Sequence, residues 1–523
     1  MAIQIIKNRL FRTIAIGAAI IFTIILILQF GVKKYIINFL DQKIPDHIHL
    51  VHGQIEVNLL TGFVQLQDIT LELRDRDSGV KLAELHMKAF NLEGFGYFNY
   101  FFRNNIGAKN IKLLNPKIGY YSGIDSGKIN FDLPQQAKTG KSFTLARLEI
   151  VDGELVDIQK ETDTIKFMVE KLNLSVENLK TDKILIEKKI PFSYGAYTLS
   201  TGKIFVDLGP YEALTVRDAS IKNEEVELNN VSLKSKYTKV TLSEILEKER
   251  DHIDLKMPVV KLSKMEYGFN ADRFFLKTNS VHIQNPICEI YRDKLIQDDW
   301  VQKKLYSRKL REMPMDLDIS EVIINKGHLS YAELVNVGTL PGELVFSDLE
   351  ARLNNVSNTY ENGETTMIEA RALLMGNAPI QLQWNFDSSK ENDAFYVSGM
   401  VKDFESESIN QFLKSNLRTK AEGDINELYF TVSGDAISSR GDMKMKYRDF
   451  RFMVLKKDRL GVNKFLTFIG NMITNDGSKT DDRGYRYGVI YAERDTTKSF
   501  FNYLWNNVMD GILNTLTGDG KKE

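Results

Sequence analysis

Short runs of alternating apolar and polar residues dominate most of the chain and restrict it to a β-rich fold. Val64 and Leu66 alternate with glutamines, Asp68 shifts the phase, and Ile69 and Leu71 resume the alternation. A period of two places successive side chains on opposite faces of a strand, so each run predicts a half-buried strand. Similar runs occupy residues 109–121, 145–158, 171–179, 221–233, 254–262, 322–331, 346–356, 380–386, 395–401 and 427–432. We expect a mainly β protein with a mostly antiparallel sheet.

A few segments depart from this pattern and predict short helices. Residues 241–244 read TLSE, a capping box that would open a helix at Thr241. Residues 298–310 and 406–417 carry apolar side chains near helical spacing. Residues 500–516 form an amphipathic pattern that ends before Gly518. This last helix either docks on the sheet or touches a membrane, and the lack of a Lys/Arg row on its polar face favours docking.

Charge and cysteine content exclude several functional classes. The 69 Lys and Arg residues and 70 Asp and Glu residues leave a net charge of -1, so we expect no nucleic-acid partner. One cysteine, Cys288, and seven scattered histidines form no cluster with metal-ligand spacing. The sequence also lacks a phosphate-binding Gly-rich loop and a nucleophile elbow. We therefore expect no catalytic residue, no metal site and no cofactor, and we predict that the protein is not an enzyme.

Two groups of polar residues have both a chemical and a simpler interpretation. Alternation could place two of His47, His49 and His52 on one strand face as metal ligands, but no carboxylate cluster accompanies them, which favours a solvated trio. Carboxylate pairs could serve acid–base chemistry, but none lies in a motif that would place it in a cleft. We interpret these pairs as solvated charges: Asp316 and Asp318, Asp298 and Asp299, and Asp481 and Asp482.

An apolar stretch near the N-terminus is long enough to cross a bilayer. Residues 13–30 read TIAIGAAIIFTIILILQF, with three basic residues before them and two, Lys33 and Lys34, after them, which favours a cytoplasmic N-terminus. A cleaved signal peptide is the alternative, but no small-residue cleavage site follows the stretch. We predict a cytoplasmic segment at residues 1–12 and a transmembrane anchor at residues 13–32. The apolar anchor residues are Ile14, Ile16, Ile20, Ile21, Phe22, Ile24, Ile25, Leu26, Ile27, Leu28 and Phe30.

Two segments in the first half of the chain recur in the second half as an internal repeat. IKLLNPKIGYY at residues 111–121 matches VHIQNPICEIY at residues 281–291, with an Asn-Pro pair at the same place. LEIVDGEL at residues 148–155 then matches VIINKGHL at residues 322–329, with a shared glycine. The common order and spacing favour duplication over chance similarity between strands, because repeated strand units extend one sheet and bury one face. We predict a first half at residues 45–250, a second half at residues 251–450 and a C-terminal region with amphipathic helices at residues 451–523.

The apolar face of such a sheet must be covered by another layer or bind something apolar. A second sheet over this face would give a closed scaffold. An open face would instead give a groove for lipid acyl chains, with about 0.8 kcal/mol gained per buried CH₂ group. The residues expected to line this candidate lipid groove are Val64, Leu66, Ile69, Leu71, Leu73, Leu148, Ile150, Val322 and Ile324.

Three segments, together with the apolar N-terminal stretch and the repeated strand blocks, resemble the AsmA-type family, which includes TamB-like proteins. They are residues 59–71 (LLTGFVQLQDITL), 421–430 (AEGDINELYF) and 441–450 (GDMKMKYRDF). The resemblance implies an elongated, curled antiparallel β-groove behind a single-pass inner-membrane anchor, with the bulk of the chain in the periplasm.

The resemblance also implies a function. It suggests a role in phospholipid transport between the inner and outer membranes and in outer-membrane integrity. The implied partners are phospholipid acyl chains, the inner membrane and envelope proteins. The alternative is a structural or assembly factor for envelope biogenesis that acts through protein partners and binds no lipid.

Overall fold

The computed structural model describes residues 45–58, 61–103, 105–123, 142–182, 184–359, 364–454 and 480–518. It is 61% strand and 11% helical, which confirms the mainly β fold with few short helices. The chain divides into two compact units, described separately below. Unit 1 comprises Met1–Val231 and Tyr267–Phe274, and unit 2 comprises Ser232–Glu266 and Phe275–Glu523.

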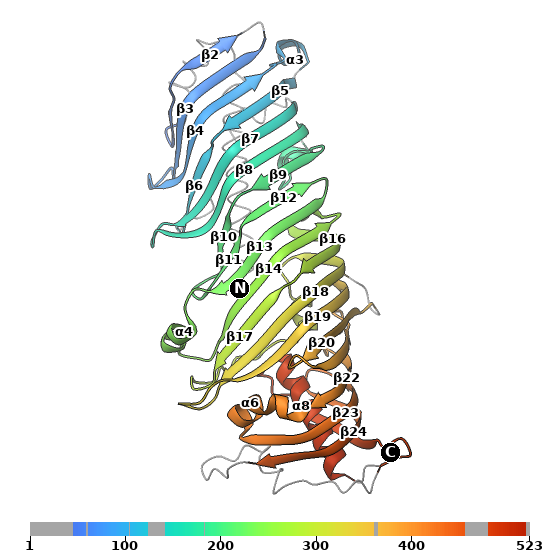
Figure 1. Cartoon of the computed structure of the whole chain (residues 1–523). Coiled ribbons are helices and arrows are strands. Elements are labelled where there is room, and N and C mark those ends of the chain that lie inside the picture. Colours follow the sequence, from blue (N-terminus) through green and yellow to red (C-terminus); the bar gives the residue numbers. More distant parts are fainter. Residues whose placement is uncertain are drawn as a thin grey trace. The chain divides into compact units, whose positions relative to one another are not determined.

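Unit 1 consists mainly of strands, coloured blue to green in Figure 1. Its strands are β1 (Ile48–Val51), β2 (Ile55–Asn58), β3 (Phe63–Arg74), β4 (Lys81–Glu93), β5 (Asn105–Leu114), β6 (Lys117–Ser122), β7 (Ser142–Gln159), β8 (Thr164–Thr181), β9 (Tyr197–Thr201), β10 (Ile204–Asp207), β11 (Glu212–Val216) and β12 (Asp218–Lys222). Its helices are α3 (Tyr97–Phe102) and the 3₁₀ turn η2 (Leu185–Glu187). Three further strands contain residues of both units: β13 (Glu225–Ser235), β15 (Glu266–Asn270) and β16 (Arg273–Gln284).

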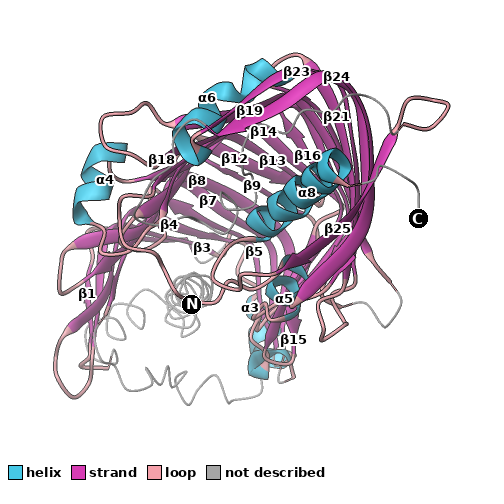
Figure 2. Cartoon of the chain, turned by 90° about the horizontal axis from the view of Figure 1, so that it is seen from below, coloured by secondary structure: helices cyan, strands magenta, loops and turns pink. Residues whose placement is uncertain are grey.

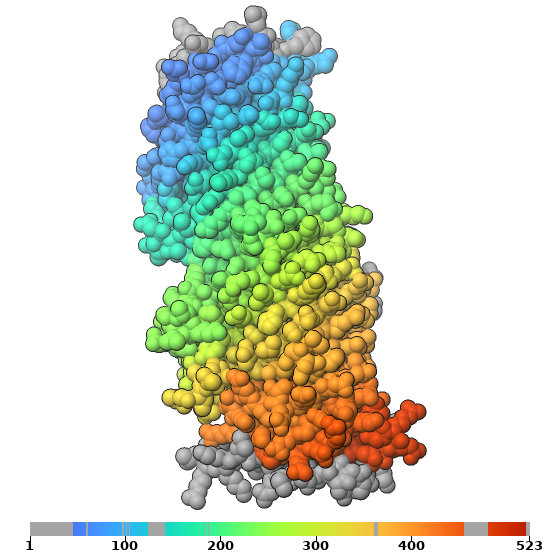
Figure 3. Space-filling view, viewed as in Figure 1, coloured from blue at the N-terminus to red at the C-terminus, as the bar shows by residue number. Residues whose placement is uncertain are grey.

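Unit 2 contains the longest helix of the described residues, α8 (Phe500–Thr517). Its strands are β14 (Asp251–Ser263), β17 (Ile287–Asp293), β18 (Asp316–Leu334), β19 (Gly342–Ser357), β20 (Thr366–Leu374), β21 (Ala378–Phe386), β22 (Phe395–Glu405), β23 (Thr419–Gly434), β24 (Ser438–Val454) and β25 (Arg486–Glu493). The other helical segments are α4 (Lys239–Ile245), α5 (Tyr306–Arg311), η3 (Ser406–Ile409), α6 (Asn410–Phe412) and the π-helical turn η4 (Leu413–Leu417). In the space-filling view, the yellow to orange strands of this unit form continuous ridges of packed side chains (Figure 3).

The sheet in each unit is mixed, so the antiparallel groove that the resemblance implied was only partly right. Most neighbouring strands are antiparallel, but β5 and β6 pair in parallel with β7, and β16 and β17 pair in parallel with β18. Parallel neighbours need a long crossover connection. In unit 2 this connection runs from the end of β17 to the start of β18 and contains α5.

The two segments that match in sequence share the same backbone geometry. Asn115 (φ 50°) separates β5 from β6, and Asn285 (φ 48°) separates β16 from β17. In each case the carbonyl of the following proline accepts a hydrogen bond of 2.8 Å from the long parallel strand, donated by the N–H of Glu154 in unit 1 and of His328 in unit 2. Both Asn-Pro breaks therefore let one long strand pair with two consecutive short ones.

Residues in the left-handed conformation shift the phase within strands. Asp68 (φ 50°) lies inside β3, with Val64 and Leu66 buried before it and Ile69 and Leu71 buried after it. One such residue moves the alternation by one position, so the apolar residues on both sides of it reach the same face. This confirms the predicted phase shift at Asp68. The same conformation recurs inside other strands at Asp152, Lys171, Lys326, Asp348, Asp403 and Asp449.

The short helices differ in detail from the sequence expectations. The N-cap of α4 is Thr238, whose Oγ1 accepts a hydrogen bond of 3.2 Å from the Thr241 N–H, so the prediction that a helix opens at Thr241 was wrong. Only Tyr306–Arg311 is helical within residues 298–310, and residues 406–417 form three short helical pieces. The C-terminal amphipathic helix is confirmed as α8, with Ser499 as its N-cap.

The predicted transmembrane anchor at residues 13–32 lies outside the described residues. Among the residues that are described, no helix has both the length and the apolar character needed to cross a membrane.

The left-handed position at Asn285 gives a test of the Asn-Pro break. A β-branched side chain is disfavoured at positive φ, whereas glycine adopts it freely. We expect Asn285→Val to lower the free energy of unfolding by about 1–2 kcal/mol relative to Asn285→Gly. Chemical denaturation of both variants measures the difference. Equal stability would show that the break does not depend on this conformation.

Candidate functional site

Unit 2 carries an apolar face on which side chains from neighbouring strands line up. Val322 on β18 pairs with Val281 on β16 and Leu353 on β19, and paired residues project to the same face. The register from β14 to β25 defines a first row: Leu262, Val281, Val322, Leu353, Ile368, Trp384, Val397, Val432, Gly441 and Ile490. A second row runs beside it: Val260, Ile283, Ile324, Ala351, Ala370, Leu382, Gly399, Phe430, Met443 and Gly488. Neither row contains a polar side chain other than the indole of Trp384.

The opposite face of the same strands is polar. Glu350 and Arg352 on β19 are exposed, as are Glu369 and Arg371 on β20 and Gln381 on β21. Each of these residues alternates with a member of the two rows. The strands are therefore amphipathic, with charge on one side and an apolar surface on the other.

Burial changes along the first row. Leu262, Val281, Val322, Leu353 and Ile368 are half-buried. From β21 onward the side chains of the row are buried, and the exposed fraction is 7% at Trp384, 0% at Val397 and Val432, and 2% at Ile490. The same apolar face thus has a partly accessible part, from β14 to β20, and a covered part, from β21 to β25.

Helix α8 covers the buried part of this face. Figure 2 shows α8 lying inside the curve of the sheet next to β25. The ring of Phe500 stacks on Trp384, with centroids 4.3 Å apart and planes 10° apart, and Phe395 meets Phe500 edge-on. Tyr306 of α5 packs edge-on against Trp384 at 5.4 Å. These aromatic rings form a wall where the first row passes under the helix, and we call the four residues the aromatic wall.

Two glycines allow α8 to approach the sheet closely. A Cβ atom at Gly488 of β25 would lie 2.5 Å from the backbone nitrogen of Thr515, and one at Gly511 of α8 would lie 2.7 Å from Cε of Met443. Real Cβ atoms do not reach such distances, so any larger residue would push the helix away. The C-terminal half of α8 therefore packs against the sheet at a distance that only glycine at these two positions allows.

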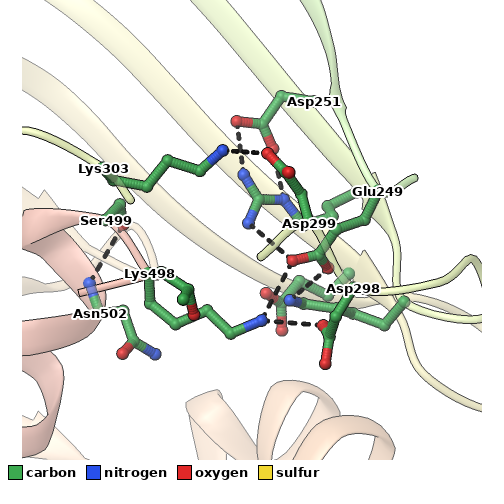
Figure 4. Close-up of polar contacts among 12 residues, drawn as sticks. Glu249, Asp251, Asp298, Asp299, Lys303, Lys498, Ser499 and Asn502 are labelled. Atoms are coloured by element: carbon green, nitrogen blue, oxygen red, sulfur yellow. Dashed lines mark hydrogen bonds and ion pairs between the residues drawn. The ribbon is translucent and has the colours of Figure 1, made fainter. Parts of the chain in front are cut away.

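A buried ion network holds the N-terminal end of α8 (Figure 4). The carboxylate of Glu249, whose side chain is only 4% exposed, lies 2.6 Å from Nζ of Lys294 and 3.2 Å from Nζ of Lys498. Lys498 directly precedes the N-cap residue and also contacts Asp298 at 2.8 Å. Arg292 completes the group with a bidentate pair to Asp251 at 2.7 and 2.8 Å. A buried carboxylate needs such partners to offset its desolvation.

The network shifts the pKa of its members. A hydrogen bond from Lys498 holds the pKa of Asp298 below its ordinary value. Burial lowers the pKa of Lys498, but hydrogen bonds and attraction from Asp298 and Glu249 outweigh burial and raise it overall. Asp298 and Lys498 are therefore both charged at neutral pH, and their ion pair keeps the start of α8 attached to the segment that precedes α5.

A buried arginine holds the other end of α8. Arg486 of β25 is 2% exposed, and its guanidinium donates hydrogen bonds of 2.8 Å to the carbonyl oxygens of Thr515 and Gly518. The last carbonyls of a helix have no partner within the helix, and a cation there also complements the helix dipole. Charged groups therefore hold α8 at both ends.

The structure divides the predicted groove residues between the two units. Val64, Leu66, Ile69, Leu71, Leu73, Leu148 and Ile150 lie in one buried cluster of unit 1, each at most 9% exposed. The register aligns them too, because Leu66 pairs with Phe90, Phe90 with Leu113 and Leu113 with Ile150. Val322 and Ile324 lie half-buried on the rows of unit 2.

The histidines and the charged residues near α5 form no metal site among the described residues, and several of the charged residues form ion pairs. No His, Cys, Asp or Glu cluster suited to a metal occurs among the described residues, and His47 has a lowered pKa caused by burial and by Arg76. Asp299 forms an ion pair with Lys303. Lys304 and Arg308 both pair with Glu312. Asp299, which we expected to be solvated, is therefore used in a local ion pair.

Sequence reasoning missed the residues that matter most for the covered part of the face. Trp384 lies in a run predicted as a strand, but alternation alone gives no cross-strand register. Glu249 and Lys498 are far apart in the chain, and no local pattern marks them as partners. The isolated pattern of β25 around Arg486 was not recognised as a strand.

The ion network predicts how firmly the start of α8 is held. Lys498→Met removes the charge that joins Glu249 to Asp298 but keeps most of the side-chain stem. We expect this variant to lose about 2 kcal/mol of stability and to show faster hydrogen exchange in the first turns of α8. Lys498→Arg, which keeps the charge, is the control. Wild-type exchange in the Met variant would mean that apolar contacts alone hold the helix.

The lowered pKa of Asp298 predicts a pH dependence. A carboxylate with a lower pKa in the folded state contributes stability above its unfolded pKa, and this stability is lost as the pH falls through the folded pKa. The stability difference between the wild type and Lys498→Met should therefore shrink below about pH 4. Denaturation at a series of pH values measures it. A difference that grows in acid would contradict the assignment.

Comparisons with known proteins leave the family open. No family model matches the chain, and no curated protein matches it in sequence. The resemblance to the AsmA-type family stays a prediction, and the inference of function rests on the geometry of the apolar face.

Proposed function

We propose that the protein binds phospholipid acyl chains on the apolar faces of its sheets and helps to move phospholipid between membranes. The observation that supports this most is the half-buried part of the first row, from Leu262 to Ile368, where apolar side chains of successive strands follow one another without a polar residue. Each CH₂ group buried there contributes about 0.8 kcal/mol. The polar headgroup stays in water beside the sheet.

The mechanism is passive. An acyl chain that moves along the rows exchanges one apolar contact for another, because each strand presents the same kind of side chain at intervals of ~4.8 Å. No step requires the chain to cross a polar group, so the barriers between neighbouring positions are small. The sheet acts as a local substitute for the bilayer interior.

The proposed setting follows from the N-terminal stretch. An anchor at residues 13–32 would hold the protein in the inner membrane as a single-pass protein, with the bulk of the chain in the periplasm. From there the apolar faces could receive lipid from one membrane and pass it towards the other, in support of outer-membrane integrity.

One observation favours a second candidate function. Helix α8 shows that this face accepts an amphipathic helix, since Phe500, Met509 and Leu513 are buried against the sheet. A helix supplied by an envelope protein could bind the half-buried part through its own apolar face. The protein would then be an assembly factor that binds no lipid.

Lipid content separates these two functions. We expect the full-length protein, purified in detergent and washed, to retain phospholipid detectable by extraction and mass spectrometry. Val322→Asp places a carboxylate on the first row and should reduce bound lipid at least about tenfold. Ile323→Asp, one residue away on the opposite face, is the matched control. Folded wild-type protein without lipid would favour the assembly factor.

A further inference from the structure

The partly accessible and covered parts of the apolar face of unit 2 are continuous. The two rows pass from β20 to β21 without a change of register or of side-chain character. What changes is the cover, because Trp384 on β21 lies under the first turn of α8, in contact with Phe500. Any apolar ligand on the rows therefore meets α8 at this point.

Helix α8 is a fixed cover rather than a loosely packed one. The Glu249 network holds its start, Arg486 holds its end, and Gly488 lets its backbone approach the sheet. Between them the side-chain amide of Asn507, 1% exposed, pairs with the Ser439 hydroxyl at 2.7 Å, and Asp510 accepts the Tyr491 N–H at 2.8 Å. These contacts together hold the helix against β24 and β25 along its length.

We propose that α8 is a stop that closes the acyl-chain site of unit 2 at the aromatic wall. The site extends over β14, β16, β18, β19 and β20 and ends at Trp384 and Phe500. On β21 to β25 the apolar side chains of α8 cover the rows. On β14 to β20 an acyl chain covers them instead. This inference rests on the proposed function and adds where the lipid binds and where it cannot pass.

The side chains on the two parts of the rows differ in a way that fits different occupants. Under α8 the second row contains Gly488, where a Cβ atom would lie 2.5 Å from the backbone nitrogen of Thr515, so a glycine there gives the helix backbone room. From β14 to β20 the rows contain no glycine. A helix could not approach as closely there, whereas an acyl chain is thin enough to lie on the side chains. The accessible part therefore fits an acyl chain better than a second helix.

The length of the site fits a single acyl chain. Strand spacings of ~4.8 Å from β14 to β20 give about 19 Å along the rows. One leaflet of a bilayer core is about 15 Å thick, half of the ~30 Å total. One acyl chain of about 15 Å laid across the strands thus fits within the accessible part.

Photo-crosslinking of the full-length protein tests the proposal. The probe is a phosphatidylethanolamine with a diazirine in its acyl chain, in vesicles of phosphatidylethanolamine and phosphatidylglycerol, and mass spectrometry locates the adducts. We expect adducts on Val322, Leu353 and Ile368 and none on Val432 or Ile490. Adducts on Val432 or Ile490 in the wild type would overturn the stop, and adducts on strands of unit 1 alone would overturn the location.

The absence of adducts on every strand, whatever labelling the predicted anchor at residues 13–32 shows, would instead refute the proposed lipid-binding function, so the two failures are distinguishable. A second variant tests the wall itself. Phe500→Ala removes the ring that stacks on Trp384, and its adducts should extend to Trp384 and Val397. Phe501→Ala is the control, because Phe501 is 56% exposed beside it. An unchanged adduct pattern in folded Phe500→Ala protein would overturn the role of Phe500 as the stop.

Discussion

The fold depends on keeping apolar side chains on one face across many strands. Long strands twist and bend, and a strand that slips by one residue would turn its apolar side chains to the solvent. The chain resolves this conflict with single left-handed residues such as Asp68, Lys326 and Asp449, which bend a strand while returning the alternation to the same face. Most of these positions carry Asp, Asn or Lys, and Asp and Asn tolerate positive φ at low cost. The bends therefore preserve the apolar face.

The apolar face then requires a cover, and unit 2 provides one over part of it. Burial of Phe500, Leu513 and Leu516 supplies the attraction, but apolar contact alone does not fix the position of a helix on a smooth surface. Position comes from directional groups at the two ends, the Glu249 network and Arg486. Both involve buried charges, which are costly to leave unpaired and so penalise any other placement of the helix. The boundary between the covered and accessible parts is therefore sharp.

The sequence predicted local properties well and long-range ones poorly. Alternation around Val322 and Ile324 placed them on the apolar face, and the amphipathic pattern of residues 500–516 predicted a docked helix, because both signals lie within a few residues. The parallel pairing of β17 with β18 and the contact between Glu249 and Lys498 involve distant segments and leave no periodic trace. The predicted helix at residues 298–310 was too long, since Asp298 binds the distant Lys498 instead of continuing a helix. A tertiary ion pair overrode the local pattern there.

A closed end changes what an apolar sheet can do with a lipid. On an open row an acyl chain could enter at one end and leave at the other, so the sheet would serve as a conduit. Because α8 covers the rows at the aromatic wall, an acyl chain on unit 2 can leave in two ways only. It can move back along the strands by which it entered, or it can leave the rows sideways into water or a membrane. Sideways release exposes the whole chain at once and costs about 0.8 kcal/mol per CH₂ group unless an apolar acceptor is in contact. Under the proposed function, transfer from unit 2 therefore requires a membrane or a second apolar surface to meet the accessible strands directly.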